Sequence, residues 1–237
     1  MELGLAMAGF ALAGLVQGVS GFGSGMVVMA LLPALWPVSE VVPLSALFSV
    51  VLNAGLTWHL RAEFEGREVI PLALGSLVGV PLGVAFLANV DPALVMATLG
   101  WILIGFGAWR LMGTRVRQPR FSRSWAPAAG VLSGLTAGAF NVGAPAMLVY
   151  AGGRDWKRDA FRGNLQASFF AGGIVLIVSL VVAGLIDALV LERFAYLAPA
   201  GALGGLLGAR IAKKIPQAIF NTLVLVMVVF MGASYLV

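Results

Sequence analysis

The run Gly18-Val19-Ser20-Gly21-Phe22-Gly23-Ser24-Gly25 lies in the middle of an apolar stretch that extends from about residue 3 to residue 36. Closely spaced glycines disfavour a continuous helix, and the stretch is longer than the roughly 20 residues that cross a bilayer. A second long stretch, residues 126–152, is interrupted in the same way by Ala137-Gly138-Ala139-Phe140-Asn141-Val142-Gly143. We therefore predict that the chain breaks inside each stretch, either as one bent helix or as two half-helices.

The composition predicts an all-α, multi-pass integral membrane protein. Of the 237 residues, 60% are hydrophobic and 11% are charged, and the mean hydropathy is +1.00, whereas soluble domains carry roughly 25% charged residues. With no cysteine and one histidine, the chain offers no usual zinc site, and we expect no metal or other cofactor. The net charge of +5 comes from basic residues that flank apolar segments, so we expect no nucleic acid as a partner.

Six further apolar segments are predicted to cross the membrane, at residues 41–60, 69–88, 93–112, 163–185, 194–212 and 217–236. The positive-inside rule decides how the two long stretches run. If each enters and leaves on the same side as a hairpin, all of the 15 basic residues except Arg193 lie on the cytoplasmic side. A simple crossing places the basic clusters at residues 154–162 and 210–214 outside. We therefore predict six spans and two hairpins, with both termini outside.

The two halves of the chain resemble each other, which predicts an internal repeat. Residues 14–20 match residues 130–136, and Gly75, Gly79 and Gly83 match Ala200, Gly204 and Gly208. The predicted organisation is one membrane domain with repeat 1 at residues 1–112, a basic cytoplasmic linker at 113–125 and repeat 2 at 126–237. Three crossings and one hairpin in each repeat make the repeats inverted, as in secondary transporters. Chance similarity of glycine-rich helices is the alternative. The glycine stripes are assigned to close helix packing.

The predicted half-helices would begin near Gly25 and Gly143 and point their N-termini toward the midplane of the membrane. Free N–H groups and the helix dipole make such N-termini anion sites, and neutral polar side chains gather around them. No charged residue falls in the centre of a predicted span. For the Ser and Thr hydroxyls, the alternative is a bond back to their own helix. The candidate substrate-binding residues are Gln17, Ser20, Gly21, Phe22, Gly23, Ser24, Gly25, Asn53, Ser133, Thr136, Phe140, Asn141, Gly143, Asn164 and Gln166.

Two further features bear on nucleotide binding and on proton coupling. The glycine-rich run at residues 20–25 lacks the Gly-Lys-Ser/Thr ending of a P-loop and follows no strand, so nucleotide binding is not expected. His59, the only histidine, is the candidate residue for proton coupling. Because it lies beside Trp58 and Arg61 at the inner end of its segment, a passive interfacial role is the alternative.

At these motifs the chain resembles the sulfite exporter family TauE/SafE. The likeness rests on Gly18-Val-Ser-Gly-Phe-Gly-Ser-Gly25, on Gly134-Leu-Thr-Ala-Gly-Ala-Phe-Asn-Val-Gly143, on the duplicated four-segment units and on Gly208-Ala-Arg-Ile-Ala212. The resemblance implies export of sulfite, sulfoacetate or other organosulfonates across the cytoplasmic membrane. Ala137, Ala139 and Asn141 stand where the family often has glycine.

We therefore predict a secondary transporter of small anions in the inner (cytoplasmic) membrane, and not an enzyme. Its expected partners are a small anionic substrate and the lipid bilayer, and a homodimer is allowed. An anion channel is the main alternative. A membrane-embedded enzyme would need an acid, base or nucleophile at membrane depth, and a purely structural subunit would not explain two helix breaks.

Overall fold

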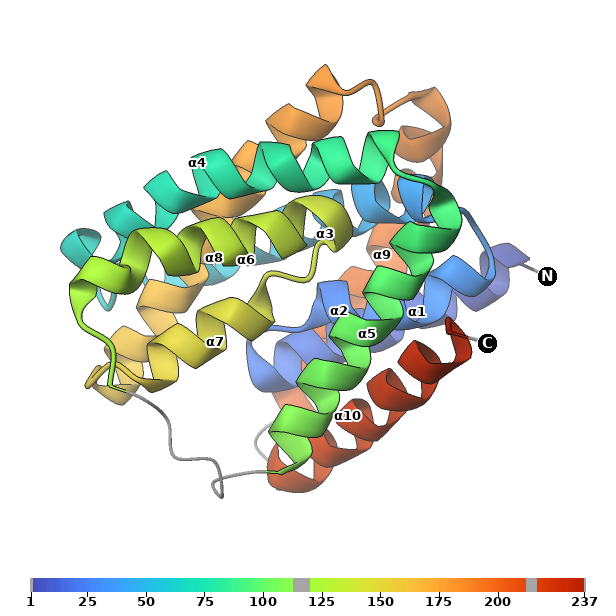
Figure 1. The fold of residues 1–237 in the computed structure, drawn as a ribbon. Coiled ribbons are helices and arrows are strands. Elements are labelled where there is room, and N and C mark those ends of the chain that lie inside the picture. Colours follow the sequence, from blue (N-terminus) through green and yellow to red (C-terminus); the bar gives the residue numbers. More distant parts are fainter. Residues whose placement is uncertain (1, 113–119, 212–216, 237) are drawn as a thin grey trace. The chain divides into compact units, whose positions relative to one another are not determined.

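The computed structural model describes residues 2–112, 120–211 and 217–236 (Figure 1). These residues form helices and connecting loops, and no strand occurs within the described ranges. Residues 113–119 of the predicted linker lie outside them. The helices are α1 (Glu2–Ser20), α2 (Ser24–Leu31), η1 (Leu32–Ala34), α3 (Val38–His59), α4 (Gly66–Asn89), α5 (Pro92–Leu111), η3 (Arg123–Trp125), α6 (Ala126–Phe140), α7 (Ala144–Gly152), α8 (Arg158–Val182), α9 (Ala188–Ile211) and α10 (Gln217–Ser234).

The helices match the predicted apolar segments, but several begin earlier. α8 begins at Arg158 and α9 at Ala188, where apolar runs were predicted to start at residues 163 and 194. The added residues at these helix starts include charged ones such as Asp159 and Glu192. A hydropathy window detects only the apolar part of a helix, whereas backbone hydrogen bonding continues into the polar ends.

Six helices are long and apolar enough to cross a membrane: α1, α3, α4, α5, α8 and α9. The chain is therefore a multi-pass membrane protein. This set differs from the six predicted spans at both ends of the chain. α1 has 19 residues, about 28 Å, so this arm of the first stretch is long enough to span a membrane by itself. In the last helix, the apolar part is the shorter segment Val224–Ser234, which is not among the six candidate spans.

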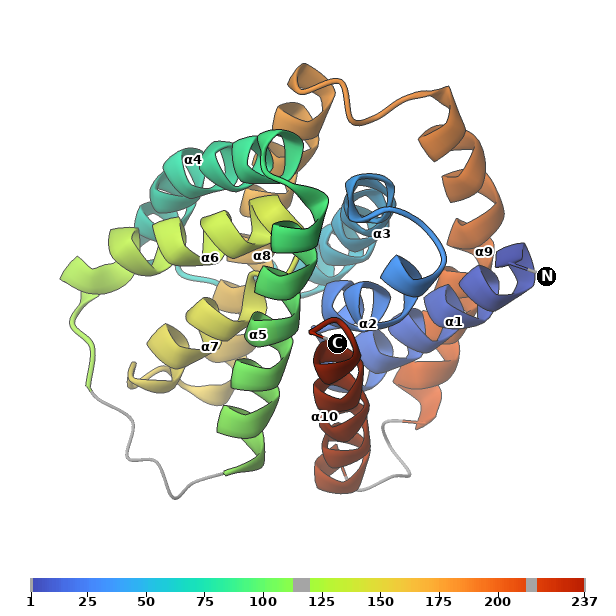
Figure 2. The ribbon, with the colours of Figure 1, turned by 45° about the vertical axis from the view of Figure 1, so that its right-hand side comes forward.

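The residues group into two compact units, and each unit combines segments from both halves of the sequence. Unit 1 contains Met1–Ser45, Asn89–Val116 and Ile186–Val237. In it, α1 packs on both α2 and α9, and α10 packs on α5 (Figure 2). Unit 2 contains Ala46–Ala88 and Arg117–Leu185, and in it α6 packs on α7 and α8. The repeat boundaries concern sequence similarity and stay a prediction.

Glycines bring two pairs of helices into backbone contact. In unit 2, a Cβ added to Gly75, Gly79 or Gly83 of α4 would overlap the carbonyl oxygen of Pro127, Val131 or Leu135 of α6. Since the contact positions rise together along both helices, α4 and α6 are parallel. In unit 1, a Cβ at Gly204 or Gly208 of α9 would overlap the carbonyl oxygens of Ala11 or Leu15, so α9 and α1 are parallel as well. The predicted packing role of these glycines is confirmed.

Candidate anion site

The first helix break, between α1 and α2 in unit 1, depends on two glycines. Gly21 has φ 83° and Gly23 has φ 99°, a backbone conformation that glycine adopts without steric cost. α1 therefore ends at Ser20 and α2 begins at Ser24, with Gly23 as its N-cap residue. The predicted site residues Gly21, Phe22 and Gly23 form the break itself.

The polar side chains at the first break hold its backbone in place. The Oε1 of Gln17 accepts a hydrogen bond from the N–H of Ser24 at 3.1 Å, and its Nε2 donates to the carbonyl of Gly21 at 3.4 Å. The Ser20 hydroxyl lies 2.7 Å from the carbonyl oxygen of Val16, within its own helix, and 2.6 Å from that of Phe22. Gln17 thus caps the N-terminus of α2. By position, the next N–H groups of this first turn, those of Gly25 and Met26, have no intrahelical partner.

The second helix break, between α6 and α7 in unit 2, is made without a left-handed glycine. Asn141 has φ 52° and is the one non-glycine residue with positive φ among those described. Asparagine is enriched in this region because its side chain can hydrogen-bond locally. The Asn141 N–H donates to the carbonyl of Ala137 at 2.7 Å, and α7 begins at Ala144 with Pro145 in its first turn.

Side chains also tie the second break to its surroundings. The Nδ2 of Asn141 donates to Oγ of Ser49 on α3 at 3.0 Å. The Ser133 hydroxyl donates to the carbonyl of Gly143 at 2.8 Å, and a Cβ added to Gly143 would lie 2.9 Å from that same Ser133 Oγ. Gly143 is thus required by close packing, not by its backbone angle, since its φ is −80°.

The other predicted residues on the α6 side have local roles. The Thr136 hydroxyl bonds back to carbonyls of its own helix at 3.2 Å. Phe140 is buried and its ring meets that of Phe86 edge-on, with centroids 6.1 Å apart. Asn53 is buried one turn after Ser49 on α3, and is therefore on the face that meets Asn141.

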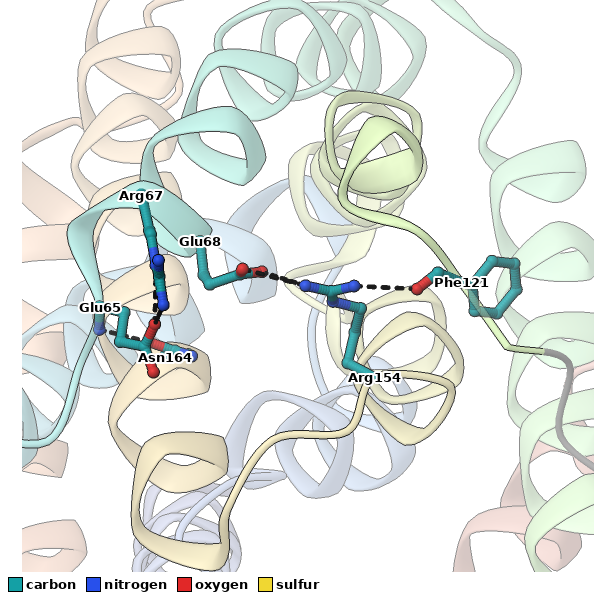
Figure 3. A network of polar contacts seen from close by, with 6 residues as sticks. All are labelled: Glu65, Arg67, Glu68, Phe121, Arg154 and Asn164. Atoms are coloured by element: carbon teal, nitrogen blue, oxygen red, sulfur yellow. Dashed lines mark hydrogen bonds and ion pairs between the residues drawn. The ribbon is translucent and has the colours of Figure 1, made fainter.

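The structure does not bring Asn164 to the second break. Its Oδ1 accepts the N–H of Glu65, just before α4, at 2.7 Å (Figure 3). Glu65 lies beyond the end of α3, and α3 runs for about 15 Å from Ser49 to His59. Gln166 is buried two residues further along α8. His59 is exposed at the end of α3, next to Trp58, over whose ring the Arg61 guanidinium lies at 4.7 Å.

Charged residues are paired at the ends of helices. In unit 2, the Nη2 of Arg154 lies 2.9 Å from a carboxylate oxygen of Glu68, and its Nη1 donates to the carbonyl of Phe121 at 3.0 Å (Figure 3). In unit 1, Arg193 pairs with Glu40 and lies over the ring of Trp36 at 4.3 Å. The two units share this pattern. In each of them, an arginine–glutamate ion pair beside a tryptophan connects the chain that follows the short half-helix to another helix of the unit.

Sequence reasoning missed Ser49, the direct partner of Asn141. A signal was present, because Ser45, Ser49, Asn53 and Thr57 recur at every fourth position of an apolar helix and therefore share one face. The ion pairs were also missed. Glu68 and Arg154 are separated by 86 positions, and no local pattern connects them.

Comparison with known proteins gives one result at the level of the family. The family model described as "Sulfite exporter TauE/SafE" matches residues 5–235. Neither a curated protein nor a solved structure matches the chain. The match covers nearly all of the chain, including both breaks, and so the chain belongs to the sulfite exporter TauE/SafE family.

Proposed function

We propose that this chain is a secondary transporter that exports small sulfur-containing anions, such as sulfite, sulfoacetate or other organosulfonates, across the cytoplasmic membrane. Membership of an exporter family and the six apolar helices support transport across a membrane. The observation that carries the mechanism is the pair of interrupted helices, since irregular backbone inside a membrane persists where it is buried in protein or lines a water-filled cavity.

In this proposal, the anion binds at a break through backbone N–H groups and neutral side chains. At the first break, Gln17 occupies the N–H of Ser24 and leaves those of Gly25 and Met26 for a ligand. At the second break, Pro145 has no N–H, and Ala144 and Ala146 supply the donors. The positive ends of the helix dipoles favour negative charge. Without a buried counter-charge at the break, an anion can bind and leave again.

We further propose that α1–α2 and α6–α7 are re-entrant hairpins. Several contacts support this topology. The Phe121 N–H, before α6, donates to the carbonyl of Gly153, after α7, at 2.9 Å, so both ends of this hairpin meet. In the other hairpin, a Cβ added to Gly9 would meet the side chain of Leu32. The first arm of each proposed hairpin is also parallel to a helix of the opposite predicted repeat: α1 to α9, and α6 to α4. Two repeats related by a two-fold axis would repeat this relation in the same way.

Labelling of single cysteines tests the hairpin, because the natural chain has no cysteine. The exposed residues Arg120 and Lys157 flank α6–α7. Cysteines at these two positions should react with a membrane-impermeant reagent from the cytoplasmic side only, and a cysteine at exposed Asp91 should react from the other side. Labelling of residues 120 and 157 from opposite sides would show that α6 and α7 together cross the membrane.

Alternating access between inverted repeats is the proposed mode of transport. Purified protein should be stabilised against heating by its substrate according to the ligand concentration over Kd, in a panel of sulfite, sulfoacetate, sulfate, phosphate and carboxylates. In proteoliposomes, flux of the stabilising anion should saturate and respond to a counter-ion. Unsaturable flux would indicate a channel, and no stabilisation by any sulfur-containing anion would contradict the proposed substrate class. The predicted homodimer stays a prediction, because the structure describes one copy of the chain.

A further inference from the structure

A group of buried hydrogen-bond donors lies in the last turn of the short half-helix α7 and in the segment just after it. The Tyr150 hydroxyl, the Nε of Arg154 and the indole Nε1 of Trp156 are buried, and none of them has a hydrogen-bond partner among the described residues. Tyr150 itself is 2% exposed. A buried donor without a partner is destabilising, and the great majority of buried polar groups in proteins are paired. Three within one short segment therefore point to a ligand that supplies acceptors.

The three donors form one cluster. The rings of Tyr150 and Trp156 meet edge-on with centroids 5.9 Å apart, and the Arg154 guanidinium carbon lies 6.0 Å from the centre of the Trp156 ring. Phe121 also packs on Tyr150, at 6.0 Å between centroids. The cluster therefore combines aromatic rings with the Arg154 guanidinium.

Arg154 is fixed in position but only partly used. Its two terminal nitrogens bind Glu68 and the Phe121 carbonyl (Figure 3), and its Nε–H is left over. The Glu68 carboxylate balances the charge of Arg154. An acceptor that binds at Nε therefore meets fixed donors and a neutral ion pair, in which the Glu68 carboxylate would repel a negative charge.

A neighbouring residue on α8 has the same shortage of acceptors. Asn164 is fully buried, and because its Oδ1 accepts from Glu65, its Nδ2 is oriented away from that bond; the Nδ2 has no described partner. Trp156 packs on Phe161 at 6.4 Å, one helical turn before Asn164. The chain around the cluster is also rich in positive charge, with Arg120, Arg123, Lys157 and Arg162 against Asp155 and Asp159.

We propose that Tyr150, Arg154 and Trp156 form a second anion site, which binds a small free oxyanion such as sulfite, a sulfonate or phosphate through three N–H and O–H donors. An oxyanion offers acceptors only and so complements this set. The choice of sulfite as the natural ligand rests on the proposed function. The existence of the site rests on the donors alone.

The test measures anion binding by the full chain in nanodiscs of zwitterionic lipid, by isothermal titration with sodium sulfite and with phosphate. Tyr150→Phe removes one donor and keeps the ring, and Trp156→Phe removes one donor and keeps an aromatic, though smaller, ring, so affinity at this site should fall about 10-fold or more. The exposed Tyr196 and Trp125 provide matched controls, and Tyr196→Phe and Trp125→Phe should leave binding unchanged.

Glu68→Gln gives a result that a purely structural role would not. It removes the repelling charge and retains a carbonyl oxygen for Arg154, so the oxyanion should bind about 10-fold tighter. Unchanged or weaker binding in Glu68→Gln, together with unchanged binding in the Phe variants, would overturn the proposal. Loss of sulfite and phosphate binding when the nanodisc contains anionic lipid would overturn a free oxyanion as the ligand, because a lipid headgroup would then occupy the site.

Failure of this site can be distinguished from failure of the proposed site at the breaks. In Asn141→Ala, the side chains of Tyr150, Arg154 and Trp156 are intact, so sulfite should still bind at this site. The Tyr150, Trp156 and Glu68 variants should then change that binding as given above. If Asn141→Ala retains all sulfite binding and Tyr150→Phe loses it, the cluster binds the anion and the proposed break site does not. If Asn141→Ala loses all binding, the second site does not exist.

Discussion

At the break between α1 and α2, two glycines with φ 83° and 99° turn the chain, whereas at the break between α6 and α7 Asn141 does so with φ 52°. The cap differs accordingly. Gln17 on the first arm bonds the N–H of Ser24 within the same hairpin, while the Asn141 side chain reaches Ser49 on another helix. The first break is thus stabilised by a contact between α1 and α2, and the second by a contact with α3 as well.

The glycine requirement differs between the breaks as well. Gly23 has room for a Cβ, which would make an ordinary van der Waals contact with Val16 Cγ1 at 3.6 Å, but it has a left-handed backbone. Gly143 has an ordinary backbone but crowded surroundings, with Ser133 Oγ and O at 2.9 and 3.0 Å from an added Cβ. Similar glycine-rich motifs therefore arise from two different physical needs, and substitutions can separate them.

Gly143→Leu should have the largest effect, because a bulky side chain at this crowded position would displace Ser133 and cover the first turn of α7. Anion binding at the second break should be abolished while the protein still inserts in the membrane, as measured by the thermal stabilisation assay and by membrane fractionation. Gly4→Leu, at a position with open space, is the control. If Gly143→Leu bound the anion like the parent, the second break would not hold the substrate.

Asn141→Ala should weaken anion binding by about 5-fold to 150-fold, which corresponds to the roughly 1–3 kcal/mol of one hydrogen bond to a charged ligand. Asn141→Gly preserves the left-handed backbone and removes the same side chain. Equal losses in the two variants would assign the effect to the amide, and a loss in Asn141→Ala alone would assign it to the backbone. Titration of each purified variant distinguishes these results.

Gly79→Ala and Gly204→Ala compare how the two hairpins are supported. Each added Cβ would overlap a backbone carbonyl, of Val131 on α6 or of Ala11 on α1, so the free energy of unfolding should fall by about 1–3 kcal/mol with little change in anion affinity. Gly105→Ala, where nothing lies within 4 Å, should be neutral. A loss in one variant only, measured by thermal unfolding in detergent, would show that the supports are not equivalent.

Much of the fold could be predicted from local pattern. The apolar runs located the helices to within a few residues, and the glycine clusters located both interruptions, since each of these properties depends on neighbouring residues. The glycine stripes predicted close packing but not the partner helix. α4 packs on α6 and α9 on α1, and such long-range choices have no local signature.

The candidate site was less predictable for the same reason. Gln17 and Asn141 were identified because polar residues in apolar helices are conspicuous. Asn164 was grouped with them for its polarity, yet its side chain accepts a hydrogen bond from the N–H of Glu65. Its position along α8 determines this partner, and polarity alone does not reveal it. The Asn141 bond to Ser49 joins residues 92 positions apart, beyond any spacing rule.

The smallest effect should come from Gly23, and it tests the difference between the breaks most directly. Because the site has space for a side chain, Gly23→Ala should lose only the backbone term, about 1–2 kcal/mol of unfolding free energy. Asparagine is better tolerated with positive φ, so Gly23→Asn, which copies the residue type of the second break, should lose roughly half of that.

Gly184 provides the matched control for this comparison. It has φ 71° and open space but lies after the end of α8 and belongs to neither break. Gly184→Ala should lower stability by a similar amount in thermal unfolding and leave anion binding unchanged. Equal destabilisation by Ala and Asn at position 23 would contradict the backbone explanation, since the two residues differ in their tolerance of positive φ and not in the space that the site offers. Backbone angle would then not be what distinguishes the first break from the second.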